Sequence, residues 1–134
     1  NRQDLRLHFV ISAALKVISD SGMSSAVGEF KELLDAGSGS GFSFADLAAD
    51  MAGVRLAERL LDGTGEGWSA QVTLAETTDE RVFFPSIVDL PECLTQEPFE
   101  VGYGDLRDPR YQSMLTEIRQ RLAALPLYSD LHKL

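Results

Sequence analysis

The chain has 134 residues, of which 44% are hydrophobic and 25% charged, a composition typical of one globular domain. Acidic residues outnumber Lys and Arg by 21 to 12. The net charge of −9, with no basic cluster, argues against nucleic acid and anionic membrane surfaces as partners. No apolar run approaches the ~18 residues of a membrane span. Because the chain begins with Asn1, we expect that an N-terminal piece has been removed, and a membrane anchor is considered only in that piece.

Helical signals dominate the first part of the chain. An apolar run without Gly or Pro predicts a buried helix over about residues 4–19, and a shorter helix follows over 24–34. The next helix has the clearest start, because Ser43 is a good N-cap and Asp46 lies three residues after it, close to a capping box. This third helix should extend to about residue 61.

Strand signals appear after residue 62. Apolar and polar residues alternate over 68–74, which predicts a half-buried strand, and a turn leads to a second strand over 81–84. We interpret the pair as a β-hairpin, with a third short strand over 99–103. Asp108 and Pro109 are a good N-cap and first helical residue for a final amphipathic helix. The apolar face of this helix comprises Tyr111, Met114, Leu115, Ile118 and Leu122.

The predicted fold class is therefore α+β, mainly α. An N-terminal three-helix unit occupies residues 1–62, and a β-hairpin with a C-terminal amphipathic helix occupies 63–134. We expect the two parts to pack together as one domain.

Two aspartates lie on the apolar side of the third predicted helix. On a helical wheel, Asp46 and Asp50 fall in the middle of the apolar arc. A buried carboxylate without a partner takes up a proton rather than stay ionised, so Asp50 must be paired, hydrogen-bonded, metal-bound or protonated. Asp46 has a second explanation, because a carboxylate in the first turn favours the helix N-terminus.

Candidate partners for Asp50 lie on the first predicted helix. A polar stripe with i, i+4 and i+8 spacing comprises Asp4, His8 and Ser12. In the second helix, the wheel alone places Lys31 and Glu32 on a solvated face. Three interpretations remain open. The first is structural: Asp50 pairs with Lys31 or His8, or forms a hydrogen bond with a neighbouring helix end.

The second interpretation is a divalent metal site. It would use His8 with Asp46, Asp50 or Glu32, a ligand set that suits zinc, manganese or iron. The third is catalysis, with Asp50 or Glu32 as general base.

Three motifs match a known family. They are Asp4-x-x-x-His8-Phe9, then Gly28-x-x-Lys-Glu-Leu-x-Asp35, and then Gly39-Ser-Gly-Phe-Ser-Phe-x-Asp-Leu-x-x-Asp-x-x-Gly53. The chain resembles the YfiM-like family of bacterial lipoproteins over about its first 60 residues, and more distantly the VanZ-like membrane proteins. It departs from the family at Leu5, where a Lys is usual, and in a shorter segment between His8 and Lys31.

The resemblance implies that six polar residues converge: Asp4, His8, Lys31, Glu32, Asp46 and Asp50. It also implies an exported protein of the periplasm or cell envelope. Our first functional hypothesis is a non-enzymatic binding or structural module, in which the polar cluster locks the helices together and the second half binds an envelope protein. The alternative is a metal-dependent hydrolase that acts on an envelope component.

Overall fold

The computed structural model describes residues 2–18 and 41–129. The regular elements in these two ranges are helices. They are α1 (Gln3–Ile18), α3 (Phe44–Leu60), α4 (Gly65–Glu76), the short 3₁₀ helix η1 (Glu80–Val82), α5 (Gln96–Tyr103) and α6 (Pro109–Ala123). The helix predicted over 24–34 lies outside the described residues, as do Lys31 and Glu32.

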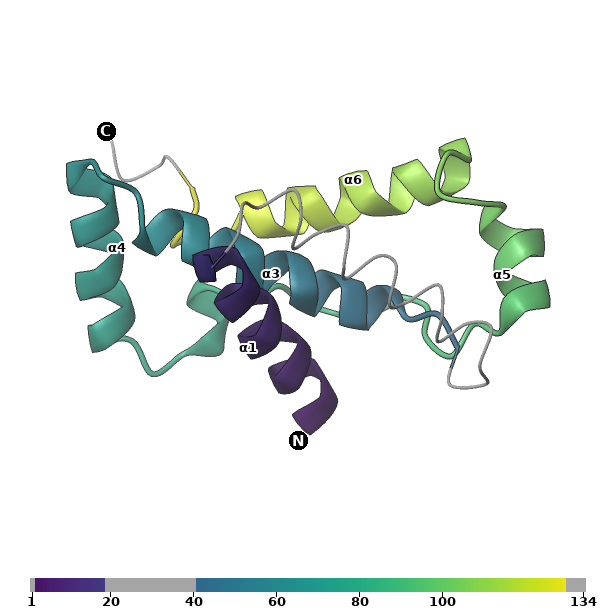
Figure 1. Cartoon of the computed structure of the whole chain (residues 1–134), viewed down its shortest axis with the longest axis horizontal. Helices are drawn as coiled ribbons and strands as arrows, with labels where there is room; N and C mark the ends of the chain where they lie inside the picture. The colour runs from purple at the N-terminus through teal and green to yellow at the C-terminus, as the bar shows by residue number, and fades with distance from the viewer. Residues whose placement is uncertain (1, 19–40, 130–134) are drawn as a thin grey trace.

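Helix α3 is the centre of the described structure and contacts α1, α4 and α6. In Figure 1, α1 crosses α3, α6 runs along it, and α4 and α5 lie near opposite ends of the molecule. The predicted start of α3 is confirmed, because the Asp46 N–H donates to Ser43 Oγ at 3.0 Å. The helix ends at Leu60, close to the predicted end.

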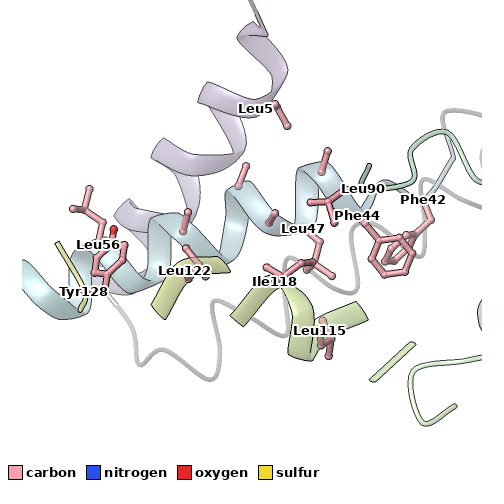
Figure 2. Close-up of a cluster of buried hydrophobic side chains, with 14 of the residues drawn as sticks. Leu5, Phe42, Phe44, Leu47, Leu56, Leu90, Leu115, Ile118, Leu122 and Tyr128 are labelled. Atoms are coloured by element: carbon pink, nitrogen blue, oxygen red, sulfur yellow. The ribbon is translucent and has the colours of Figure 1, made fainter. Parts of the chain in front are cut away.

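The main core lies between α3 and α6. Asp108 caps α6 by accepting a hydrogen bond from the Arg110 N–H, and Pro109 is its first residue, so the predicted start is confirmed. Ile118 of the predicted apolar face lies beside Leu47 of α3, and Leu122 lies farther along α3, on the side of Leu56 (Figure 2). The buried residues of α6 are Tyr111, Leu115, Ile118 and Leu122.

An aromatic cluster packs the start of α3 against α5 and α6. The rings of Phe42 and Phe99 lie 4.7 Å apart between centroids, and those of Phe44 and Tyr103 are at the same distance. Tyr111 of α6 also contacts Phe44, at 5.9 Å. Ring pairs at such distances add about 0.5–1.5 kcal/mol each beyond the apolar area that they bury. The cluster thus fixes α5 and α6 against the first turn of α3.

The predicted β-hairpin is wrong, and in the described residues the fold is all-helical rather than α+β. Residues 68–74 belong to α4, residues 81–84 begin within η1 and extend past its end, and residues 99–103 belong to α5. Thr64 caps α4 by accepting a hydrogen bond from the Glu66 N–H. A short alternation of apolar and polar residues also occurs in helices, and tertiary packing decides between the two.

The packing of α4 explains why the alternation of apolar and polar residues over 68–74 wrongly predicted a strand. Its buried residues are the small Gly67 and Ala70, one turn apart, whereas Trp68 is 70% exposed. A Cβ atom on Gly67 would lie 2.1 Å from the carbonyl oxygen of Asp62, so α4 can turn back on the end of α3 because this position has no side chain. Of the large apolar residues that suggested a strand, Trp68 and Val72 are exposed, and Leu74 is partly buried against the core.

Helix α1 is confirmed as a helix, but the prediction that it is buried is wrong. Leu5 is buried and Phe9 packs near Phe83, with ring centroids 5.8 Å apart. Four other large apolar residues of α1 are exposed: Leu7, Val10, Ile11 and Val17.

Candidate functional site

The candidate site lies where α1 crosses α3. The two backbones meet at Gly53, where an added Cβ would lie 2.2 Å from the carbonyl oxygen of Phe9. Only glycine permits this close approach. It brings the polar stripe of α1 onto the side of α3 that carries Asp50, one turn before Gly53.

Asp50 is hydrogen-bonded to two side chains of α1. Its Oδ1 accepts a hydrogen bond from Ser12 Oγ at 2.7 Å and lies 3.0 Å from Nδ1 of His8. Asp50 is only 5% exposed, and Ser12 is also buried. Both contacts come from the predicted polar stripe and involve Oδ1, whereas Oδ2 of Asp50 is buried without a hydrogen-bond partner among the described residues, so the carboxylate is only partly compensated.

Asp46 lies on the other side of the imidazole. Its Oδ2 is 3.6 Å from Nε2 of His8, which is an ion-pair distance and longer than a hydrogen bond. The imidazole therefore lies between two carboxylates, one near each ring nitrogen. The side chains of His8 and Asp46 are mostly buried, at 11% and 18% exposure. An imidazole held in this way has a fixed orientation, but bulk water has little access to it.

Asp4 belongs to a neighbouring ion-pair group and not to the contacts of Asp50. Its Oδ2 lies 2.7 Å from Nη2 of Arg2, which also pairs with Glu92 in the loop before α5. The hydrogen bonds from Arg2 lower the pKa of the Asp4 carboxyl to about 2. Arg2 and Glu92 were not predicted, because they are 90 residues apart and no local pattern links them.

The structure brings together a partly different set of acidic groups from the one predicted to hold a metal. Carboxylate oxygens of Asp4, Asp46 and Glu92 lie within 4.8 Å of one another. Of the predicted metal ligands, His8, Asp46 and Asp50 converge, whereas Glu32 lies outside the described residues. Arg2 supplies positive charge to two of the three carboxylates, so their proximity does not by itself require a cation.

Comparison with models of protein families, with curated protein sequences and with solved structures found no match for this chain. Within residues 2–18 and 41–129, no helix has both the length and the apolar character needed to cross a membrane.

Proposed function

We propose that this chain is a non-enzymatic binding module of the cell envelope and that α1 is the helix that contacts a partner protein. One observation carries the proposal: α1 uses its inner side for polar as well as apolar contacts and leaves four large apolar side chains exposed. His8 and Ser12 bind Asp50 on the inner side. A helix that only completes its own core would be expected to place its apolar face inward.

The outer face of α1 has the pattern of a helix-binding surface. Its exposed apolar residues recur with spacings of three, four and seven: Leu7, Val10, Ile11 and Val17. Contiguous exposed apolar surface is uncommon in proteins that act alone, and it marks interaction sites. The hydrogen bonds of Asp50 hold this surface in one orientation, which lowers the conformational cost of binding.

The envelope location rests on the resemblance to the YfiM-like family. The third matching motif, which ends at Gly53, supplies Asp46, Asp50 and the glycine of the helix crossing. The motif residues are thus the ones that position α1.

Site-specific photo-crosslinking in cells tests the proposal. A photoreactive residue is placed at Val10 of the natural full-length protein, and a matched control places it at Gln120, an exposed position of α6. We expect a discrete adduct from Val10 in the envelope fraction and none from Gln120. The absence of a Val10 adduct, or the same adduct from both positions, would contradict the proposed surface. An adduct found only in the soluble fraction would contradict the location.

A second candidate is a metal-dependent hydrolase acting on an envelope component. The observation that favours it is the orientation of His8, because a carboxylate on one ring nitrogen commonly directs the other nitrogen to a metal. Asp50 lies at Nδ1, and Asp46 lies near Nε2 as a second candidate ligand.

Thermal melting in the presence of Zn²⁺ or Mn²⁺ separates this candidate from the first. If the site binds metal, the ion should raise the melting temperature of the wild type but not of Asp46→Asn, while the surface control Asp105→Asn should respond like the wild type. An equal response in all three proteins would count against a metal at this site.

A further inference from the structure

The polar contacts between α1 and α3 leave one buried charged atom without a partner. Asp50 is 5% exposed, and Ser12 and His8 of α1 both contact its Oδ1. Its Oδ2 is also buried and accepts no hydrogen bond from the described residues. A buried charged oxygen without a hydrogen bond has lost its contacts with water and has not replaced them. The docked position of α1 therefore carries a penalty that Asp50 would not have beside water.

The apolar attachment of α1 is smaller than that of α6. Among the described side chains, α6 buries four large residues, whereas Leu5 is the large apolar residue that α1 buries. Phe9 adds ring contacts with Phe83 and Phe84, at 5.8 and 5.7 Å between centroids. Because buried apolar area is the main favourable contribution to packing, α1 gains less from docking than α6 does.

The ion pairs at the start of α1 add little to its attachment. Arg6 lies 3.6 Å from Glu80, and the two side chains are 64% and 68% exposed. Arg2 pairs with Glu92, and these side chains are also partly exposed. Water and salt screen such pairs, so they break at low cost. Neither pair involves a residue of α3 or α6, so both can break while those two helices stay packed.

We propose that α1 acts as a latch: it leaves α3 as one unit while α3 and α6 remain packed, and the polar contacts of Asp50 set how readily it does so. Proteins open locally in cooperative units, and units with few buried apolar contacts open at the lowest free energy. A partly satisfied polar junction favours opening, whereas an apolar junction of the same shape would hold α1 more firmly. Ser12 and His8 still fix the orientation of the docked helix.

The latch extends the proposed function, and its use by a partner rests on that proposal. A partner of the docked helix contacts the outer face, where Leu7 and Val10 are exposed. A partner that takes up the released helix also covers Leu5 and Phe9, and so it buries more apolar area. The opening is measured on the chain alone. Its failure and the failure of the crosslinking test at Val10 are therefore separate results.

Labelling of buried thiols with iodoacetamide measures the opening. In a Cys93→Ser background, Leu5→Cys places a thiol on the buried side of α1, and Leu115→Cys places one on the core face of α6. Leu5 and Leu115 are 4% and 3% exposed, so either thiol reacts only after an opening. Relative to the urea-unfolded chains, we expect the thiol of Leu5→Cys to react at least tenfold faster. Equal rates would show that α1 is released only when the whole fold opens, and would overturn the latch.

Two variants with opposite expected effects test the role of Asp50. Asp50→Ala alone removes a buried acceptor from His8 and Ser12, so the thiol on α1 should react faster. Asp50→Ala combined with His8→Leu and Ser12→Ala nearly conserves the total side-chain volume and removes the polar groups together. The thiol should then react at least tenfold more slowly. The control Val10→Ala raises helix propensity away from Asp50 and should slow the reaction by no more than about threefold. A triple variant that reacts as fast as the wild type, or faster, would show that the polar contacts do not promote opening.

Discussion

Helices α1 and α6 both contact α3, but α6 buries an apolar face, whereas α1 also buries polar side chains. The buried face of α6 is made of Tyr111, Leu115, Ile118 and Leu122. The inner face of α1 combines the apolar Leu5 with His8 and Ser12, which bind Asp50. Much of the apolar surface of α1 faces outward instead.

The two helices therefore contribute to the fold in different ways. Buried apolar area stabilises at roughly 25 cal/mol per Å², so α6 contributes mainly to the stability of the folded chain. Helix α1 is held by a close backbone crossing and by directional hydrogen bonds, and these fix its rotation about its own axis. The apolar residues that it does not bury are then free to contact a partner.

The same substitution in each helix should have very different effects. Ile118 is fully buried, so Ile118→Ala should lower the free energy of unfolding by about 2–5 kcal/mol. Ile11 is 48% exposed, so Ile11→Ala should change it by no more than about 0.5 kcal/mol. Urea unfolding followed by circular dichroism measures both values. An equally large loss for Ile11→Ala would mean that the outer face of α1 is covered in the folded chain, and the comparison would fail.

The next largest effect is expected at the helix crossing. Gly→Ala inside a helix normally adds about 1 kcal/mol of stability through helix propensity. At Gly53 the added methyl group would lie 2.2 Å from the Phe9 carbonyl oxygen, so the two backbones must separate. We expect Gly53→Ala to destabilise by about 1–3 kcal/mol, as overpacking does. The control is Gly102→Ala in α5, where no atom lies within 4 Å of the added Cβ and a small gain is expected. A gain at both positions would contradict the close crossing.

The parts of the fold that sequence predicts correctly depend on local signals. Ser43 and Asp108 cap the helices that follow them, and each capping bond joins residues two or three apart. The strand prediction over 68–74 failed because the only buried residue of that segment is the small Ala70, and the alternation gave equal weight to Trp68 and Val72, which are exposed. The contact of Gly67 with Asp62 that allows this packing is a property of the folded chain.

The site was predictable in part for a different physical reason. Asp50 on an apolar face required compensation because burying a charge is costly, and this argument offered His8 of the first helix as one candidate partner beside Lys31 and a metal ion. The exposure of Leu7, Val10, Ile11 and Val17 was not predicted, because a mostly apolar helix has no single hydrophobic side on a wheel. The Arg2–Glu92 pair depends on long-range folding and has no local signature.

Removal of the Asp50 carboxylate should loosen α1 selectively. Asp50→Ala deprives Ser12 and His8 of a buried acceptor, and such a loss costs about 1–3 kcal/mol. Hydrogen exchange should become faster at the amides of α1 while those of α6 stay protected, because only α1 depends on this carboxylate. Asp105→Ala, an exposed control, should leave both helices protected. Equal loss of protection in α1 and α6 of Asp50→Ala would show that the two helices are held as one unit.

The smallest effect is expected from the ion pairs of Arg2 at the start of α1. Arg2 lowers the pKa of Asp4 from 3.8 to about 2 in the folded state, so the stabilisation is complete above about pH 4 and is lost as the pH falls toward 2. The Asp4 side chain is 49% exposed, and solvent screening limits such pairs to about 0.2–1 kcal/mol. Arg2→Gln should lose this amount at pH 7 and show a weaker fall in stability between pH 4 and pH 2 than the wild type.

Urea midpoints at pH 2, 3, 4 and 7 measure that difference, with Arg107→Gln as the matched loss of one positive charge. Other carboxyls with lowered pKa, such as Asp79 and Asp108, have their own arginine partners and remain in every variant, so they cancel in the comparison. If Arg2→Gln keeps the acid dependence of the wild type, Arg2 does not hold the N-terminus of α1. The attachment of α1 would then rest on the crossing at Gly53, the contacts of Asp50 and the packing of Leu5 and Phe9.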